Sequence, residues 1–240
     1  MQIIPAIDLR GGRVVRLFQG KQDKEKVYFE NPVEVAGDFC RQGAKRLHIV
    51  NLDGAFGDDD KITRDAIFAI RAKTDVVLDV GGGIRRFETA KEYIEKGIDK
   101  IVLGSVFFDN IQQFGEILSW FADKVVLSAD VENKYVKIHG WREGSGAGLD
   151  DFFNSLKTRL VREVIVTSIV KDGTLAGIDP EFYSGIVGMT DIPVIASGGV
   201  KGLQDLEALA STGVAGVIIG KAVYENKMDL REAIEKYGSD

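Results

Sequence analysis

Short apolar runs rich in β-branched residues alternate with longer amphipathic segments along the whole chain. The runs have the length of single strands, and their near-continuous hydrophobicity is typical of strands that are covered on both faces. The predicted strands are Ile3–Ile7, Leu47–Leu52, Val76–Val80, Ile101–Leu103, Val125–Ala129, Val164–Thr167, Val194–Ala196 and Val217–Ile219. Between them, apolar residues recur at helical spacing in Phe87–Lys96, Leu203–Ser211 and Leu230–Lys236. This alternation predicts a parallel sheet covered by helices.

An internal repeat favours a closed barrel over an open, doubly wound sheet. A shift of 116 positions aligns the halves without a gap, pairing Ile49-Val50-Asn51 with Ile165-Val166-Thr167, Gly82-Gly83 with Gly198-Gly199, Gly97 with Gly213, Gly104 with Gly220, and Asn110 with Asn226. One four-stranded unit is therefore used twice. We predict an α/β fold, a single (βα)8 TIM barrel of two similar half-barrels. Its length of 240 residues is close to the roughly 250 of such barrels, and one domain is expected over residues 1–240.

Composition narrows the functional classes. The net charge is −6 and the sequence has no long basic run, which argues against nucleic-acid binding. The longest apolar runs are too short to cross a bilayer, and Met1–Leu9 has the pattern of a strand instead of a secretion signal, so we expect a cytoplasmic protein. Cys40 is the only cysteine and there are two histidines, so neither a disulfide nor a metal site is expected.

Glycine-rich turns follow four of the predicted strands, at the end of the barrel where active sites lie. In such turns, backbone N–H groups can approach anions closely. Tight packing alone would explain the glycine pair of either half if it occurred only once. Their repetition in both halves favours two phosphate sites on opposite rims. The predicted binding residues are Gly82, Gly83, Arg85, Gly104 and Ser105 in one half, and Ser197, Gly198, Gly199, Gly220 and Lys221 in the other. The implied ligand is a small molecule with a phosphate at each end.

Acidic residues end two strands between these turns. Asp8 and Asp130 correspond in the repeat and are expected to face each other, as acid–base chemistry on the centre of the ligand would require. Asp172 is a third candidate acid, although an Asp-Gly pair also caps turns. His48 lies among apolar neighbours in a predicted strand, and this pattern by itself indicates a structural role. Trp141 follows a predicted hairpin and fits either stacking on a flat ring or packing within its loop.

Two segments are predicted to be mobile without ligand and to close on it. Gly20–Lys26 is charged and has no apolar face, and the hairpin Lys134–Trp141 is followed by the glycine-rich run Gly144–Gly148.

These features together resemble the ProFAR isomerase family of histidine biosynthesis. The resemblance covers the whole chain in order. Its motifs are Ile4-Pro5-Ala6-Ile7-Asp8-Leu9, Gly12-Arg13-Val14-Val15-Arg16-Leu17, Gln19-Gly20, Leu47-His48-Ile49-Val50, Gly81–Arg85, His139-Gly140-Trp141, Lys171-Asp172-Gly173-Thr174, Ser197-Gly198-Gly199 and Gly220-Lys221-Ala222.

The resemblance implies an Amadori rearrangement of an N-linked aminoaldose to an aminoketose, without metal or cofactor. By resemblance, Asp8 is the general base at C2 of the ribose and Asp172 is the candidate acid that opens the ring. Asp130 and Thr167 would hold and polarise the ribose. Substrate contacts are implied for Arg16, His48, Trp141 and Gly177, which replaces the structural interpretation of His48.

The family usually has Asp where this chain has Asn51, so the charge is not needed here or its role has moved, for instance to Asp53. Three functions stay open: the isomerase, the sister cyclase that makes imidazole glycerol phosphate, and a phosphoribosyl-ligand binding protein. The isomerase is favoured over the cyclase by Arg16, Trp141 and the opening Ala6-Ile7-Asp8-Leu9. The complete set of aspartates argues against a binding protein without turnover. An isomerase that also accepts phosphoribosylanthranilate is a further alternative. We expect a monomer.

Overall fold

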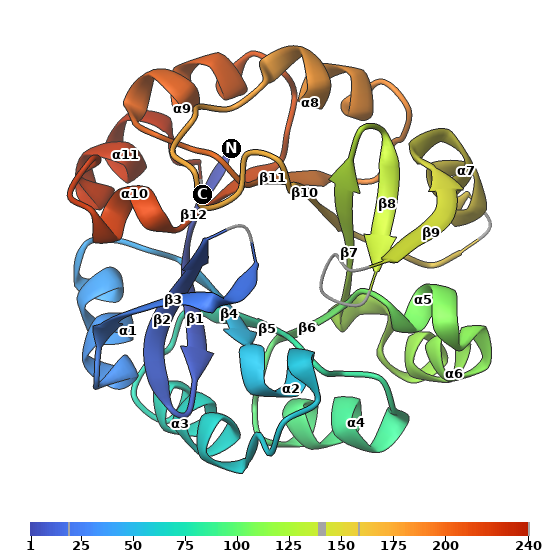
Figure 1. The fold of residues 1–240 in the computed structure, drawn as a ribbon, viewed down its shortest axis with the longest axis horizontal. Coiled ribbons are helices and arrows are strands. Elements are labelled where there is room, and N and C mark those ends of the chain that lie inside the picture. The colour runs from blue at the N-terminus through green and yellow to red at the C-terminus, as the bar shows by residue number, and fades with distance from the viewer. Residues whose placement is uncertain (19, 139–142, 158, 240) are drawn as a thin grey trace.

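In the computed structural model, which describes residues 1–18, 20–138, 143–157 and 159–239, eight parallel strands close into a barrel (Figure 1). They are β1 (Gln2–Arg10), β4 (Arg46–Asn51), β5 (Val77–Gly81), β6 (Lys100–Leu103), β7 (Val125–Glu132), β10 (Val164–Ser168), β11 (Val194–Ser197) and β12 (Gly216–Ile219). Closure comes from β1, which pairs with both β12 and β4, and from β7, which pairs with both β6 and β10. The predicted fold class and all eight predicted strands are confirmed.

Helices surround the barrel on the outside, as Figure 1 shows. The longer ones are α1 (Pro32–Arg41), α3 (Lys61–Arg71), α4 (Phe87–Glu95), α6 (Ile111–Phe121), α7 (Leu149–Leu156), α8 (Pro180–Val187), α9 (Leu203–Ala210) and α11 (Leu230–Tyr237). Short helices follow strand ends: α2 (Leu52–Phe56), α5 (Val106–Asp109) and α10 (Lys221–Tyr224). The 3-10 helix η1 (Ala122–Lys124) connects α6 to β7. Within the described part of the chain, no helix is both long enough and apolar enough to cross a membrane.

Alternation along the strands divides the core into two layers and aims the site residues. On β1, Ile3 and Ile7 pack outward against the helices, whereas Ile4 and Ala6 point into the barrel with Val102, Val126, Ile165, Ile195 and Ile218. Successive side chains of a strand alternate between its faces. An inward apolar residue near the middle of a strand is therefore followed, two positions later, by an inward residue at the C-terminal mouth. This relation leads from Ala6 to Asp8 and from Ile165 to Thr167.

The segment Gly20–Lys26, which we predicted to be a mobile loop, is instead largely part of a strand. It belongs to β3 (Lys21–Phe29), which pairs antiparallel with β2 (Arg13–Phe18), and β2 in turn pairs with β1. The segment has no apolar face, and backbone pairing and ion pairs hold it instead. Arg10 binds Glu25 at 3.1 Å and Lys26 binds Glu225 at 2.8 Å. The expectation of a loop was therefore wrong, because it judged the segment by its side chains alone, whereas its mobility without ligand stays a prediction.

The glycine-rich run Gly144–Gly148, predicted as a flexible piece, is also in a strand. It forms most of β9 (Glu143–Gly148), which pairs with β8 (Tyr135–Ile138), and β8 pairs antiparallel with the end of β7. The predicted hairpin after strand five is thus present as β7–β8, although Trp141 lies outside the described residues. In Figure 1, β2–β3 and β8–β9 lie on different sides of the barrel mouth.

Candidate active site

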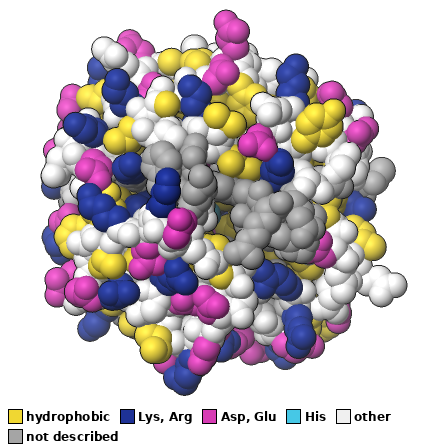
Figure 2. Space-filling view, in the orientation of Figure 1, with side chains coloured by type: hydrophobic (Ala, Val, Ile, Leu, Met, Phe, Trp, Pro, Cys, Tyr) yellow, Lys and Arg dark blue, Asp and Glu magenta, His cyan; other side chains and the backbone are white. Residues whose placement is uncertain are grey.

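A cavity of about 300 Å³ opens at the C-terminal mouth of the barrel. Its lining contains most of the residues that the sequence predicted for the site: Asp8, Arg16, His48, Gly82, Gly83, Arg85, Gly104, Ser105, Asp130, Thr167, Asp172, Ser197, Gly198, Gly199, Gly220 and Lys221. Gly177 does not line it, and Trp141 lies outside the described residues, so its role stays a prediction. Charged side chains of both signs are intermixed over this face of the molecule (Figure 2).

Asp8 and Arg16 form the central ion pair of the cavity. Arg16 Nη1 lies 2.7 Å from Asp8 Oδ2, and Arg16 Nη2 donates to the carbonyl of Ala6 at 2.8 Å. The guanidinium also lies over the ring of Tyr224, 5.2 Å from its centroid. Burial works against the charge of Arg16, but Asp8, Tyr224 and Asp172 together hold its pKa above the ordinary value. Arg16 is therefore a permanent positive charge at the centre of the site.

Two further carboxylates lie close to this pair. Burial raises the pKa of Asp172 to about 6, and the negative charges of Asp8 and Asp130 add to the effect while Arg16 opposes it. Asp130 and Ser128 lie on the face of β7 that points into the cavity, and Ser128 Oγ is 3.5 Å from Asp130 Oδ1. The structure thus brings together the three acids that the sequence proposed. One of them, Asp172, keeps its proton to a higher pH than an exposed aspartate, as a general acid requires.

The glycine turns are fixed by packing between loops. Backbone φ angles are positive at Gly82 (96°), Gly83 (79°), Gly198 (94°) and Gly199 (90°), which matches their positions in the repeat. A Cβ atom at Gly82 would lie 2.1 Å from the carbonyl oxygen of Asn51, and one at Gly199 would lie 2.6 Å from Lys171 Cβ. Glycine is therefore required here whether or not an anion binds. The two matched turns still flank the cavity on both sides.

Other predicted binding residues hold the loops of the mouth together. Arg85 donates to the carbonyls of Gly54 (3.1 Å) and Ala55 (2.8 Å), and Lys221 donates to the carbonyl of Gly173 at 2.9 Å. Gly177 donates its N–H to the Gly199 carbonyl at 3.0 Å. Arg85 and Lys221 reach the cavity as well, whereas Gly177 only supports the turn beside it.

Asn51 and Asp53 are structural in this chain. The Asn51 side chain is fully buried, caps α2 through Gly54 N, and donates to Asp60 Oδ2 (2.9 Å) and Tyr93 Oη (3.1 Å). Asp53 accepts hydrogen bonds from Gly11 N at 2.8 Å and from Thr63 Oγ1 at 2.5 Å. Neither residue lines the cavity, so the suggestion that Asp53 carries the missing charge is wrong.

The structure adds residues that the sequence reasoning missed. Asp79 on β5 contacts the imidazole Nδ1 of His48, and Lys137 on β8 lines the cavity opposite Asp130 in the strand register. Tyr224 supports Arg16 and donates to the carbonyl of Ala6 at 2.9 Å. For Asp79 a signal existed, because a charge within an otherwise apolar strand must find a buried partner. Lys137 and Tyr224 gave no such signal.

The titration of Asp172 leads to a prediction about stability. Its pKa of about 6 in the folded protein exceeds the ordinary value of 3.8, so the folded state binds more protons than the unfolded state between these values. The contribution of Asp172 to stability should therefore decrease as the pH rises from about 4 to about 6, and then level off. We expect Asp172→Asn to be more stable than the wild type by about 1 to 3 kcal/mol near neutral pH.

Urea unfolding of both proteins across this pH range measures the difference. Asp191→Asn, at an exposed position, is the matched control and should show no such increase. A constant difference between Asp172→Asn and the wild type across the whole range would contradict the raised pKa.

A closed (βα)8 barrel with three carboxylates and a buried arginine at its C-terminal mouth is the arrangement of a barrel enzyme that performs acid–base chemistry. The chain belongs to the family of histidine biosynthesis proteins, whose model matches residues 2–229.

Curated relatives agree with this family over nearly their whole length. The relative from Desulforudis audaxviator is 40% identical over 98% of this chain and 90% of its own. Those from Brachyspira hyodysenteriae (35%, covering 98% of each chain) and Aquifex aeolicus (40%, covering 96% of each chain) are similar. All three are named 1-(5-phosphoribosyl)-5-((5-phosphoribosylamino)methylideneamino) imidazole-4-carboxamide isomerase. The resemblance to the ProFAR isomerase family is thereby confirmed.

Proposed function

We propose that this chain is the isomerase for which its relatives are named, and that it converts the aminoaldose ProFAR to the aminoketose PRFAR. The observation that carries the proposal is that Asp8, Asp130, Asp172 and Arg16 line one cavity, which two matched glycine turns flank. ProFAR carries a phosphate at each end and the reacting ribose between them. Such a ligand suits a cavity with anion-binding turns on two sides and acids in the middle.

The chemistry requires one acid and one base, and the formula does not change. A proton delivered to the ring oxygen of the ribose breaks its bond to C1, and the nitrogen lone pair forms the C=N bond, which gives an open-chain protonated imine. Removal of the C2 proton then gives an enolamine, which tautomerises to the ketone. We assign the first proton to Asp172, whose pKa is about 6, and the C2 proton to Asp8. Asp130 and Thr167, which line the same cavity, would hold the ribose hydroxyls.

Turnover of ProFAR in a spectrophotometric assay tests the function directly. Phosphoribosylanthranilate and, with ammonium, the cyclase substrate should be run in parallel. We expect turnover of ProFAR and none of the cyclase substrate, and the phosphoribosylanthranilate arm decides whether the enzyme is bifunctional. Turnover of the cyclase substrate without turnover of ProFAR would overturn the proposal.

The two turns give a prediction about anions. Crystals soaked in phosphate or sulfate should show one anion near Gly83 and Ser105 and another near Gly199 and Gly220, because these turns line the cavity and can direct backbone N–H groups into it. Difference density in the soaked crystals is the measurement. Anions bound only at other places would remove the basis for a ligand with two phosphates.

The remaining assignments are also proposals. We propose that residues 1–240 form one domain, that the enzyme acts as a monomer without metal or other cofactor, and that it works in the cytoplasm. Light scattering on the purified protein tests the oligomeric state. A dimer at micromolar concentration would contradict the monomer.

A further inference from the structure

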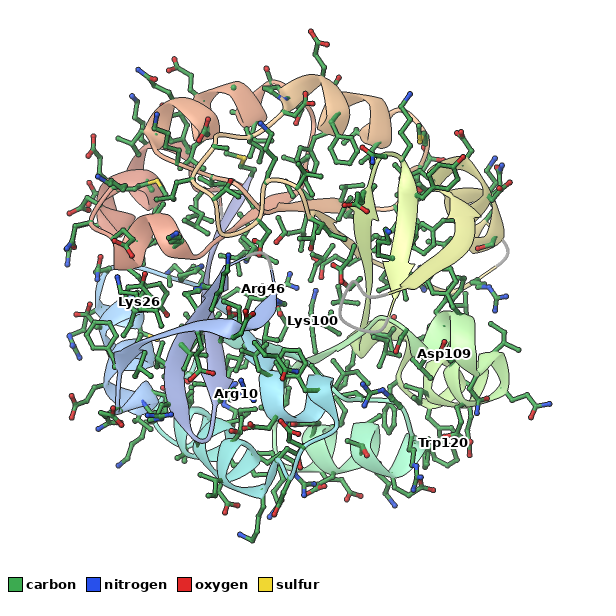
Figure 3. The ribbon with its side chains drawn as sticks, in the orientation of Figure 1. Arg10, Lys26, Arg46, Lys100, Asp109 and Trp120 are labelled. Atoms are coloured by element: carbon green, nitrogen blue, oxygen red, sulfur yellow. The ribbon has the colours of Figure 1, made fainter. Side chains whose placement is uncertain are left out.

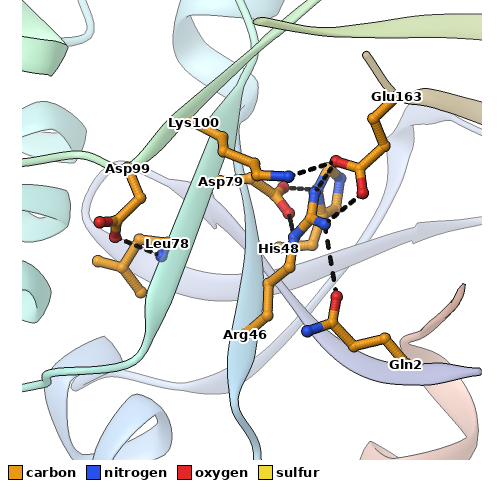
Figure 4. A network of polar contacts seen from close by, with 8 residues as sticks. All are labelled: Gln2, Arg46, His48, Leu78, Asp79, Asp99, Lys100 and Glu163. Carbon is orange, nitrogen blue, oxygen red and sulfur yellow. Dashed lines mark hydrogen bonds and ion pairs between the residues drawn. The ribbon is translucent and has the colours of Figure 1, made fainter. Parts of the chain in front are cut away.

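A largely buried network of charged side chains joins Arg46, Asp79, Glu163 and Lys100 to His48 (Figure 4). Arg46 on β4 is 2% exposed, and its Nε donates to Asp79 Oδ2 at 2.5 Å. Its other two nitrogens bind both carboxylate oxygens of Glu163, at 2.8 and 2.9 Å, and Lys100 binds Glu163 at 2.9 Å. In Figure 3, Arg46 and Lys100 lie toward the centre of the ring of helices, whereas Trp120 lies at its outer edge.

His48 is the end of this network that reaches the cavity. It lies two residues after Arg46 on β4, and the alternation of the strand gives both side chains the same inward face. Its Nδ1 is bound to Asp79 Oδ1, and the residue lines the cavity. Because Nδ1 is engaged by Asp79, Nε2 is the ring nitrogen that remains for a ligand.

The charges of the network fix which nitrogen carries the proton. Asp79 is fully buried, and the permanently charged guanidinium of Arg46 donates to its Oδ2 at 2.5 Å, which stabilises the ionised carboxylate. An ionised carboxylate only accepts hydrogen bonds, so the contact requires a proton on Nδ1. Asp79 and Glu163 are balanced by Arg46 and Lys100, so His48 need not be charged to make the contact.

We propose that Asp79 is a positioning residue, which holds neutral His48 in the Nδ1–H tautomer and so presents the lone pair of Nε2 to a hydrogen-bond donor of the substrate. Arg46 is the second part of this device, because it holds the other oxygen of Asp79 and prevents the carboxylate from turning. The consequence for turnover rests on the proposed isomerase function, whereas the tautomer itself does not.

Asp79→Asn tests this role because the amide can satisfy its neighbours in one orientation only. Arg46 only donates, so the amide oxygen must face Arg46 and the NH2 group must face His48 Nδ1. Nδ1 then has to accept, and the proton of the neutral ring moves to Nε2. The substrate would meet a donor where the wild type offers an acceptor. We expect kcat/KM for ProFAR to fall about 10- to 100-fold.

The measurement is ¹⁵N NMR of the imidazoles at alkaline pH. The chain has two histidines, so His139→Gln leaves His48 as the only signal. In that background we expect a protonated Nδ1 with Asp79, and a protonated Nε2 with Asp79→Asn. Asp191→Asn, at an exposed position outside the network, is the matched control and should keep both the Nδ1–H tautomer and a kcat/KM near the wild-type value.

Each outcome decides the proposal. An unprotonated Nδ1 in the protein with Asp79 intact overturns it, even if Asp79→Asn does not fold. A reversed tautomer with unchanged kcat/KM would remove the catalytic consequence while leaving the isomerase function in place. If the wild type does not turn over ProFAR, the proposed function fails, while the spectra still report whether Asp79 sets the tautomer.

Discussion

Replacing Asp8 with asparagine should abolish turnover of ProFAR while leaving substrate affinity within about tenfold of the wild type. The amide has nearly the shape of the carboxylate but cannot take the C2 proton. Arg16, which binds Asp8 at 2.7 Å and Ala6 at 2.8 Å, keeps its backbone contact in the variant. The loss should therefore appear in kcat, because a base acts mainly in the transition state.

Steady-state kinetics and calorimetric binding of ProFAR to the variant separate the two effects. Asp58→Asn is the matched control, since Asp58 is an aspartate of the adjacent loop that does not line the cavity. It should retain nearly full activity. A rate for Asp8→Asn within tenfold of the wild type would exclude Asp8 as the base.

Asp172→Asn should lower kcat by several orders of magnitude, because it slows ring opening and not the removal of the C2 proton. Because its pKa is about 6, Asp172 carries its proton in a larger fraction of molecules near neutral pH than an ordinary aspartate does, whereas asparagine has no acidic proton to deliver. Ring opening would then become rate-limiting. With ProFAR deuterated at C2, the isotope effect on kcat should fall toward one, because the C2 proton is removed only after the ring has opened.

Asp130→Asn is the comparison within the same site. It should also lose several orders of magnitude in rate, because Asp130 would hold the reacting ribose, but its isotope effect should not vanish. Near-normal activity of either variant would remove that residue from the mechanism. An undiminished isotope effect in Asp172→Asn would reassign the ring-opening acid to another group, with Asp130 as the first candidate.

The stability expected of Asp172→Asn and its expected loss of activity have the same cause. The cavity keeps Asp172 among Asp8, Asp130 and buried surroundings, which disfavour its charge. Such an arrangement costs folding free energy and gains a group that can deliver a proton. A variant that is both more stable and nearly inactive would show this exchange directly.

Part of the site could be predicted from local pattern because a barrel converts sequence position into direction. Each strand has two faces, so residues two apart share a face, and the mouth lies where each apolar run ends. This placed Asp8, Asp130 and Thr167 at the cavity, and the repeat placed the glycine turns on both sides of it. These relations depend only on spacing within one strand or between two copies of one unit.

Contacts between distant segments could not be predicted in this way. Asn51 and Asp53 lie at the end of a strand as the catalytic candidates do, yet their side chains bind Gly54 of α2, Gly11 and Thr63 of α3 instead of lining the cavity. The segment Gly20–Lys26 is largely strand because β2 lies beside it, not because of its own composition.

The sequence by itself determined the order of strands and helices, their closure into a repeated barrel and the inward face on which the acids lie. Only the tertiary structure decided the electrostatic state of those acids and of His48. The pKa of Asp172 depends on Asp8, Asp130 and Arg16, and the tautomer proposed for His48 depends on Asp79 and Arg46. The reason is physical: apolar burial follows from local pattern, whereas the energy of a buried charge depends on the distance and orientation of every polar group around it, including those far away in the chain.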